Sequence, residues 1–460
     1  MILNLKNICA ISDCKINIEK TNIIAGENST GKSTIGKVLF VLIKSLNIDT
    51  IQENFKKKQL YDMSNLITKI YSQIQFYNSD EIKKRGRYVS RRYIEDISRE
   101  ILNNYTSPLT KEDFLDIIDK VIYIFFKANS QNHDISLNQI NIYRKISKQR
   151  NYEKILYDYM DKINMIISED LNIHNELKFN FLKYLNSVFP DGIQNMDAKE
   201  NSSEISLYNN GDVVFLIKFD AEGNLQEFYY LDKFLFENSF FLDVTIIQSP
   251  SLLQVQNLIS SAHTKLPLYD SPNFIKYDNI VDEYIKDLND KLTSLNLGSV
   301  FSKLDEEKTN IDFNIESIIG GKVWFNEIDE KFIFTDKKNN RFSIENVASG
   351  IKSFGIIQIL LEKNLMKKNK LLIIDEPENG LHPEWQVQYA KLICELTEKN
   401  IPLLITTHSP FMVQAINYFC KDKVDFYLIE KESDFNVVKN ATNYIDVILN
   451  KLTYIFDDIM

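Results

Sequence analysis

A glycine-rich segment near the start of the chain has the spacing that binds phosphate. Residues 26–34 read Gly-Glu-Asn-Ser-Thr-Gly-Lys-Ser-Thr and match the Walker A pattern G-x-x-x-x-G-K-[ST] at every defined position. Such a loop turns backbone N–H groups toward an anion, and the helix that follows adds partial positive charge. Lys32 is predicted to reach the β- and γ-phosphates, and Ser33 to place its hydroxyl on Mg²⁺. The predicted nucleotide-binding residues of this loop are Gly26, Asn28, Ser29, Thr30, Gly31, Lys32, Ser33 and Thr34.

Two adjacent carboxylates end the apolar segment 371–375, in the manner of a Walker B strand. Successive residues of a strand point to opposite faces, so Asp375 and Glu376 face different directions. We predict that Asp375 completes the magnesium shell and that Glu376 orients or deprotonates a water beside the last phosphate. An exposed turn with two solvated acids is the competing interpretation.

Two further segments could contact the phosphates. The apolar segment 402–408 ends in His408, and an imidazole there can donate a hydrogen bond that senses the γ-phosphate. A purely structural histidine is the alternative. Ser349-Gly350 is a small-residue loop before a helix predicted to start near Phe354, which is a second anion site. Because the phosphate loop occupies one side of the nucleotide, this second loop is predicted to face a nucleotide held by another subunit.

Buried strands and helices must bring these segments together. Residues 1–25 read as strands and 34–46 as an apolar helix. The segments 213–219 and 225–231 are typical of a hairpin, and 240–250 of a strand. From about residue 50 to 190 the chain is nearly free of glycine and has helical spacing. The predicted division is therefore a head built from 1–49 and 200–460, with an inserted helical domain over 50–199.

The overall composition restricts the class of protein. The 460 residues are 44% hydrophobic and 26% charged, which excludes a disordered or collagen-like chain. A net charge of −10 argues against a surface that is coated with nucleic acid. The four cysteines lack metal-site spacing, no apolar run approaches about 20 residues, and no secretion signal is evident. We therefore expect a cytoplasmic protein without a membrane partner.

The chain resembles the heads of ABC-type ATPases in four segments and in their order. These segments are the phosphate loop, Ser349-Gly350, Asp375-Glu376 and His408. The phrases IIDEPENGLHPEWQ and LITTHSP are most similar to the SMC-like and OLD-like branch, and to ATPase subunits of anti-phage systems of the Septu and PARIS type. The resemblance implies an α/β fold, a mixed sheet flanked by helices, with ATP and Mg²⁺ as cofactors. The inserted domain is expected to be compact rather than a coiled-coil arm, because it lacks sustained heptads.

The resemblance also assigns roles and a partner. It implies a head-to-tail homodimer, as such or within a higher oligomer, with two ATPs between residues 26–34 of one subunit and Ser349-Gly350 of the other. Glu376 becomes the catalytic base, His408 the γ-phosphate switch, and 381–383 a loop that crosses the interface. Gln248, at the end of a strand, is then the magnesium-contacting glutamine, with an ordinary strand-end amide as the alternative. The family's signature loop usually has serine where this chain has Ala348, which implies slow turnover.

The sequence is compatible with more than one function. The leading hypothesis is a regulatory ATPase that dimerises around ATP and controls a separate effector, a nuclease, in anti-phage defence. The alternative is an SMC-like repair or chromosome-maintenance ATPase that clamps DNA; a transporter subunit and a small-molecule kinase fit less well. The basic cluster from Lys83 to Arg92 could contact nucleic acid or an acidic partner, although a solvated helix face is the favoured interpretation because the chain is acidic overall. The short segment after Ser409 lacks clustered acids, so the nuclease is expected on another polypeptide.

Overall fold

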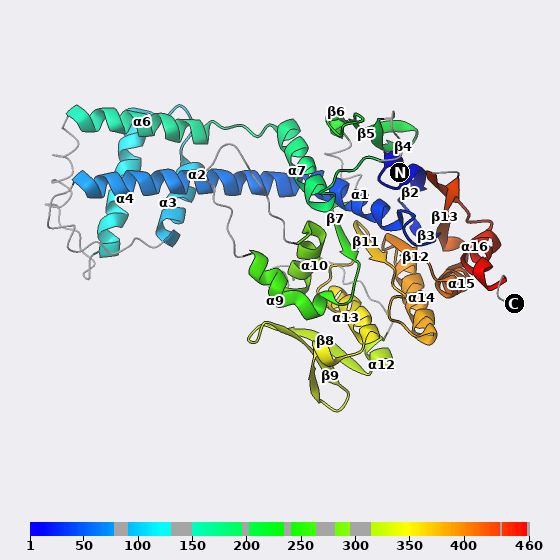
Figure 1. The fold of residues 1–460 in the computed structure, drawn as a ribbon. Helices are drawn as coiled ribbons and strands as arrows, with labels where there is room; N and C mark the ends of the chain where they lie inside the picture. Colours follow the sequence, from blue (N-terminus) through cyan, green and yellow to red (C-terminus); the bar gives the residue numbers. More distant parts are fainter. Residues whose placement is uncertain are drawn as a thin grey trace. The chain divides into compact units, whose positions relative to one another are not determined.

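The computed structural model describes residues 1–77, 91–129, 150–195, 202–233, 241–263, 281–294, 314–432 and 435–457. It divides into two compact units, one formed by Met1–Asn47 with Leu177–Met460 and the other by Ile48–Glu176 (Figure 1). The sequence prediction ended the insertion at residue 199, whereas the contacts end it at Glu176. The reason lies in α7 (Ile173–Val188), where the buried ring of Phe181 packs against Phe219 and Phe228 of the first unit.

A mixed sheet forms the centre of the first unit. Within the described residues it has eleven strands, and β13, β3, β12, β11 and β7 run parallel. The residues of the middle three of these five strands are almost entirely buried, as expected of parallel strands covered on both faces. The strands, in sheet order, are β6 (Leu225–Tyr230), β5 (Asp212–Phe219), β4 (Ser203–Asn209), β1 (Ile2–Ile8), β2 (Ile11–Asn17), β14 (Phe435–Asn440), β13 (Val424–Glu432), β3 (Thr21–Gly26), β12 (Leu403–Thr407), β11 (Lys370–Asp375) and β7 (Asp243–Ile247).

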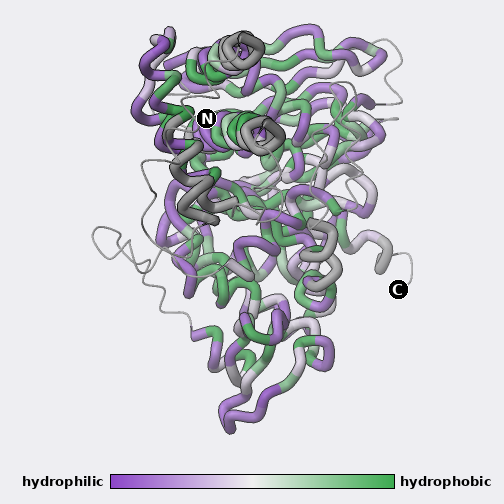
Figure 2. The backbone as a smooth tube through the Cα atoms, turned by 90° about the vertical axis from the view of Figure 1, so that its left-hand side faces the viewer, coloured by the Kyte–Doolittle hydropathy of each residue, from purple (hydrophilic) through white to green (hydrophobic). Residues whose placement is uncertain are grey.

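Helices cover both faces of the parallel strands. Helix α1 (Lys32–Ser45) packs closely on one face, where a side chain at Gly36 would collide with Ile373. The other face, which includes Leu372 and Ile405, shares a core with the helices α13 (Ser349–Glu362), α14 (Pro383–Glu398), α15 (Pro410–Cys420) and α16 (Ile445–Asp457). The predicted α/β fold with a mixed sheet flanked by helices is confirmed. Most elements bury one face, so green and purple residues alternate along the chain in Figure 2.

A small three-stranded sheet and short helices complete the described part of this unit. The sheet contains β8 (Gly321–Asn326), β9 (Lys331–Asp336) and β10 (Arg341–Ser343). The helices are α9 (Leu252–His263), α10 (Glu283–Thr293) and α12 (Ile315–Ile319). Cys394 on α14 and Cys420 on α15 form a disulfide, which sequence analysis did not predict because 26 positions separate the two residues.

The second unit is helical and has an apolar core of its own. It contains α2 (Ile48–Tyr77), α3 (Arg91–Asn104), α4 (Lys111–Asn129) and α6 (Arg150–Ile167). Its core is built from residues such as Met63, Ile67, Ile101, Phe114, Ile117 and Ile163. The predicted basic cluster from Lys83 to Arg92 lies outside the side chains that the structure describes. None of the described helices is long and apolar enough to cross a bilayer.

Candidate functional site

The predicted phosphate loop connects the end of β3 to the start of α1. Gly31 is the N-cap of α1 and has φ of +95°, a left-handed conformation that favours glycine. The ammonium of Lys32 lies across the loop and donates to the carbonyls of Gly26 at 3.0 Å and Glu27 at 2.7 Å. The Lys32 side chain is only 4% exposed, and burial lowers its pKa against the opposing charges of nearby carboxylates. The loop therefore holds a buried cation directly beneath the backbone that would surround an anion.

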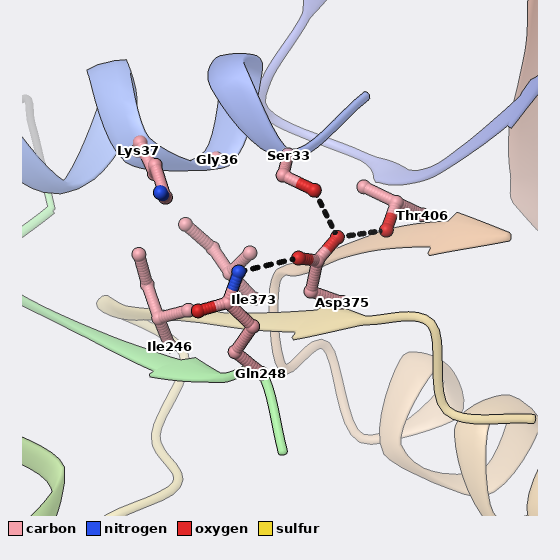
Figure 3. Close-up of a pocket in the computed structure, with 8 residues that line it drawn as sticks. All are labelled: Ser33, Gly36, Lys37, Ile246, Gln248, Ile373, Asp375 and Thr406. Carbon is pink, nitrogen blue, oxygen red and sulfur yellow. Dashed lines mark hydrogen bonds between the residues drawn. The ribbon is translucent and has the colours of Figure 1, made fainter. Parts of the chain in front are cut away.

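Asp375 gathers polar side chains from three other elements (Figure 3). It accepts hydrogen bonds from the hydroxyl of Ser33 on α1 at 2.9 Å, from Nε2 of Gln248 after β7 at 3.2 Å, and from the hydroxyl of Thr406 on β12. These residues line a small cavity together with Gly36, Lys37, Ile246 and Ile373. Parallel strands end at one edge of a sheet, which is why segments more than 100 positions apart meet here.

The donor set around Asp375 fits Mg²⁺. It offers one carboxylate and two hydroxyls, and the neighbouring Gln248 amide, whose nitrogen faces Asp375, carries a further oxygen. Oxygen ligands of this kind suit a hard cation that keeps several of its waters. Across the described residues no group of three or more His, Cys, Asp or Glu is placed to hold a metal. Ser33, Asp375 and Gln248 are the residues that would hold magnesium.

Glu376 adopts a left-handed conformation, with φ of +52°, directly after β11. Its Oε1 lies 3.7 Å from the ammonium of Lys32 and 3.4 Å from Nδ1 of His408, and its Oε2 accepts from the amide of Asn379 at 2.9 Å. Burial raises the pKa of Glu376, but Asn379, His408 and Lys32 outweigh burial and hold it below the ordinary value. The carboxylate is thus ionised at neutral pH and can accept a proton.

Glu378 is a residue of this site that the sequence analysis missed. Its side chain is 4% exposed, and Oε1 accepts from the backbone N–H of His408 at 2.8 Å and of Ser409 at 3.1 Å. The hydroxyl of Thr407 donates to the same oxygen at 2.7 Å. Glu378 therefore fixes the turn between β12 and α15 that carries His408. The sequence around Glu378 does not indicate this role, because its contacts with residues 407–409 join two segments that are distant in the sequence.

Ser349 and Gly350 form the start of α13, so this helix begins five residues before the predicted Phe354. The hydroxyl of Ser349 donates to the carbonyl of Gly380 at 2.7 Å, in the loop that follows Glu376. A side chain at Gly350 would lie 2.5 Å from the ring of Trp385, so close packing alone requires glycine there. Packing against Trp385 is therefore a structural reason for Gly350, in addition to the predicted function of the dipeptide as an anion site.

The predicted interface loop, residues 381–383, leads into α14. His382 is the N-cap of α14, and its side chain accepts from the backbone N–H of Glu384 at 3.4 Å.

Two more site residues, Thr406 and Tyr284, were missed by the sequence analysis. Thr406 could have been found as a hydroxyl two positions before the strand-end histidine, whereas Tyr284 carries no sequence signal. Its hydroxyl donates to Oε1 of Gln248 at 2.9 Å.

Comparisons with known proteins bear on this site. Residues 218–413, less than half of the chain, match a family described as "AAA domain, putative AbiEii toxin, Type IV TA system". The Septu protein PtuA of Bacillus thuringiensis is 30% identical over 137 residues, which are 25% of this chain and 34% of that protein. An OLD nuclease of Thermus scotoductus is 29% identical over 108 residues, 22% of this chain and 20% of that protein. The chain thus spans about a third or less of the curated relatives it matches.

Solved structures of SMC heads are also similar to the chain. The SMC head domain from Thermotoga maritima matches with a TM-score of 0.35 and 10% identity, over 95% of this chain and 97% of that one. A Pyrococcus furiosus Smc head with an extended coiled coil, bound to a domain of ScpA, gives a TM-score of 0.36 and 11% identity, over 100% and 98%. The match to the AAA-domain family and the two curated relatives confirm the predicted resemblance to OLD-like proteins and to the Septu defence system.

Proposed function

We propose that the chain hydrolyses ATP, dimerises head to tail around it, and thereby controls a separate effector nuclease in defence against phage. The observation that carries this proposal is the meeting of Ser33, Asp375, Glu376 and His408, from three distant segments, beside the buried Lys32. A cation, a magnesium-type donor set and an ionised carboxylate are groups that phosphoryl transfer to water uses. The imidazole adds a hydrogen-bond donor for the terminal phosphate.

The chemistry assigned to each residue follows from its present contacts. On nucleotide binding, Lys32 exchanges the carbonyls of Gly26 and Glu27 for phosphate oxygens. Magnesium, when bound, neutralises the developing phosphate charge. Glu376 accepts the proton of the attacking water, and its lowered pKa means that the carboxylate is ionised at neutral pH. His408, whose side chain is 36% exposed, keeps a ring edge available to the terminal phosphate.

The dimer and the effector belong to the same proposal. In it, Ser349-Gly350 of one copy faces the nucleotide of the other, and residues 381–383 lie at the interface. The contact between Ser349 and Gly380 supports this arrangement, because it links the second anion loop to the segment that follows Glu376. The similarity to a Septu protein and to an OLD nuclease supports the defence role and the nuclease partner.

A single purified preparation can test the core of this proposal. We expect the chain to hydrolyse ATP with Mg²⁺, and to double its mass by light scattering when ATP is present but not when ADP is. A chain that hydrolyses ATP at the same specific rate at every protein concentration, and stays monomeric, would overturn the shared site. A chain that binds no nucleotide would overturn the whole function.

A further inference from the structure

A chain of two hydrogen bonds joins helix α10 to the candidate magnesium site. The hydroxyl of Tyr284 donates to Oε1 of Gln248 at 2.9 Å, and Nε2 of Gln248 donates to Oδ2 of Asp375 at 3.2 Å. Tyr284 is buried, with 3% of its surface exposed. We propose that Tyr284 is a positioning residue that sets the orientation of the Gln248 amide and thereby strengthens binding of magnesium-nucleotide. This inference rests on the proposed function of the site.

The present orientation of Gln248 is unsuited to a metal. Its amide nitrogen faces Asp375, and an amide NH₂ group has donors but no lone pair to give to a cation. A half-turn of the amide exchanges its oxygen and nitrogen, after which Oε1 faces the metal side. The same half-turn brings Nε2 to the place that Oε1 now occupies, against the hydroxyl of Tyr284. The partner at that place must then accept a hydrogen bond where it formerly donated one.

A tyrosine hydroxyl can serve in both orientations. It has one donor and free lone pairs, so it can donate to Oε1 or accept from Nε2. In the second case its own proton needs another acceptor, and the carboxylate of Asp282, two positions earlier in the chain, acts on this hydroxyl and can serve as that acceptor. Neither orientation of Gln248 then leaves a buried polar group without a partner, which would be costly. A phenylalanine at this position could satisfy neither orientation.

Helix α10 is anchored independently of Gln248. Lys44 on α1 and Lys291 on α10 each pair with both Asp243 on β7 and Asp287 on α10, at 2.5 to 2.9 Å. These four charged side chains are largely buried, and they tie α10 to the start of β7 and the end of α1. Tyr284 is therefore a fixed point against which the Gln248 amide can turn.

The test measures the affinity of a non-hydrolysable ATP analogue, with Mg²⁺ and with EDTA, so that hydrolysis plays no part. In wild type we expect Mg²⁺ to tighten binding. In Tyr284→Phe the gain from Mg²⁺ should shrink by about three- to tenfold, the effect of one lost neutral hydrogen bond, while affinity in EDTA stays unchanged. The matched control is Tyr184→Phe, since Tyr184 packs against the same Phe40 ring at the same 6.1 Å as Tyr284.

A second variant separates positioning from packing. In a Gln248→Ala background there is no amide to orient, so Tyr284→Phe should add no further loss of the magnesium gain. This inference alone would be overturned if Mg²⁺ tightened binding of the analogue to Tyr284→Phe as much as to wild type. It would also be overturned if Tyr284→Phe reduced the effect of Mg²⁺ equally in the presence and absence of the Gln248 side chain. If wild type binds the analogue under neither condition, the proposed function fails, and this inference fails with it.

Discussion

The carboxylate of Glu378 accepts a hydrogen bond from the backbone of His408 and lies beside the ring of the same residue. Oε1 accepts the N–H of His408 at 2.8 Å and lies 3.3 Å from Nδ1 of the imidazole. Glu376 approaches the same ring nitrogen at 3.4 Å. Both carboxylates lie on the Nδ1 side of the ring, so Nε2 is the nitrogen that the proposed function assigns to a phosphate. The orientation of the proposed switch thus depends on a buried acid outside the four recognised motifs.

Replacing Glu378 should separate its structural and functional contributions. Glu378→Ala removes the acceptor of two backbone N–H groups and one hydroxyl, so we expect it to lower the free energy of unfolding by about 2–3 kcal/mol. Glu378→Gln keeps one acceptor oxygen but loses the negative charge beside His408. It should cost about 1 kcal/mol or less and slow ATP hydrolysis about tenfold, with ATP affinity retained. Denaturant unfolding and steady-state kinetics measure the two effects.

The control for this pair is Glu398→Gln, at an exposed residue that pairs with Lys423. It should change neither stability nor turnover appreciably, because exposed ion pairs contribute little. If Glu378→Gln hydrolysed ATP as fast as Glu398→Gln, then Glu378 would be only a structural cap of the turn.

Lys32 should be essential for nucleotide binding. Its ammonium is the buried cation of the loop, and charge-assisted hydrogen bonds to phosphate contribute about 1.5–3 kcal/mol. Lys32→Ala should therefore weaken ATP binding by about 10- to 150-fold, as measured by equilibrium titration. Lys20→Ala is the control, because Lys20 is half-exposed and pairs with Asp425. Equal affinities in the two variants would contradict the phosphate-loop assignment.

Local patterns were enough to predict the elements and the residues at their ends. The phosphate loop, the strand before Asp375 and the strand before His408 lie where their apolar runs and flanking residues placed them. Gln248 was predicted only through a family resemblance, and the structure brings it to Asp375. Glu378 could not be predicted, because its contacts link segments about 30 positions apart and a buried acid looks like a solvated one in the sequence. Tyr284 was missed because its contact with Gln248 also joins segments that are far apart, at 36 positions.

Asp243 should make stability sensitive to acid. Burial raises its pKa, but Lys291 and Lys44 outweigh burial and lower it from 3.8 to about 2. Because the folded-state pKa is depressed, the stabilisation is present above about pH 4 and is lost as the pH falls toward 2. Asp243→Asn should thus destabilise the protein by about 3 kcal/mol at neutral pH, since it leaves buried charges underpaired. The difference in free energy of unfolding between wild type and Asp243→Asn should become smaller as the pH falls from about 4 to 2.

Chemical denaturation at several pH values measures this difference. The matched control is Lys423→Gln, which breaks an ion pair whose side chains are 55% and 54% exposed and should cost less than about 1 kcal/mol at any pH. A difference between wild type and Asp243→Asn that stays constant down to about pH 2 would show that the cost is not electrostatic.

Glu376 should be needed for hydrolysis but not for binding. Glu376→Gln keeps the size of the side chain and removes the group that accepts a proton, so turnover should fall by about 10²- to 10⁴-fold. Lys32 loses a negative neighbour at 3.7 Å, which should leave ATP affinity equal or tighter. With ATP bound but not consumed, the dimer should persist, and light scattering should find twice the monomer mass. Glu384→Gln, in the first turn of α14, is the control and should hydrolyse ATP like wild type. A Glu376→Gln variant with undiminished turnover would remove this residue from the chemistry, and one that binds ATP yet stays monomeric would remove the nucleotide from the interface.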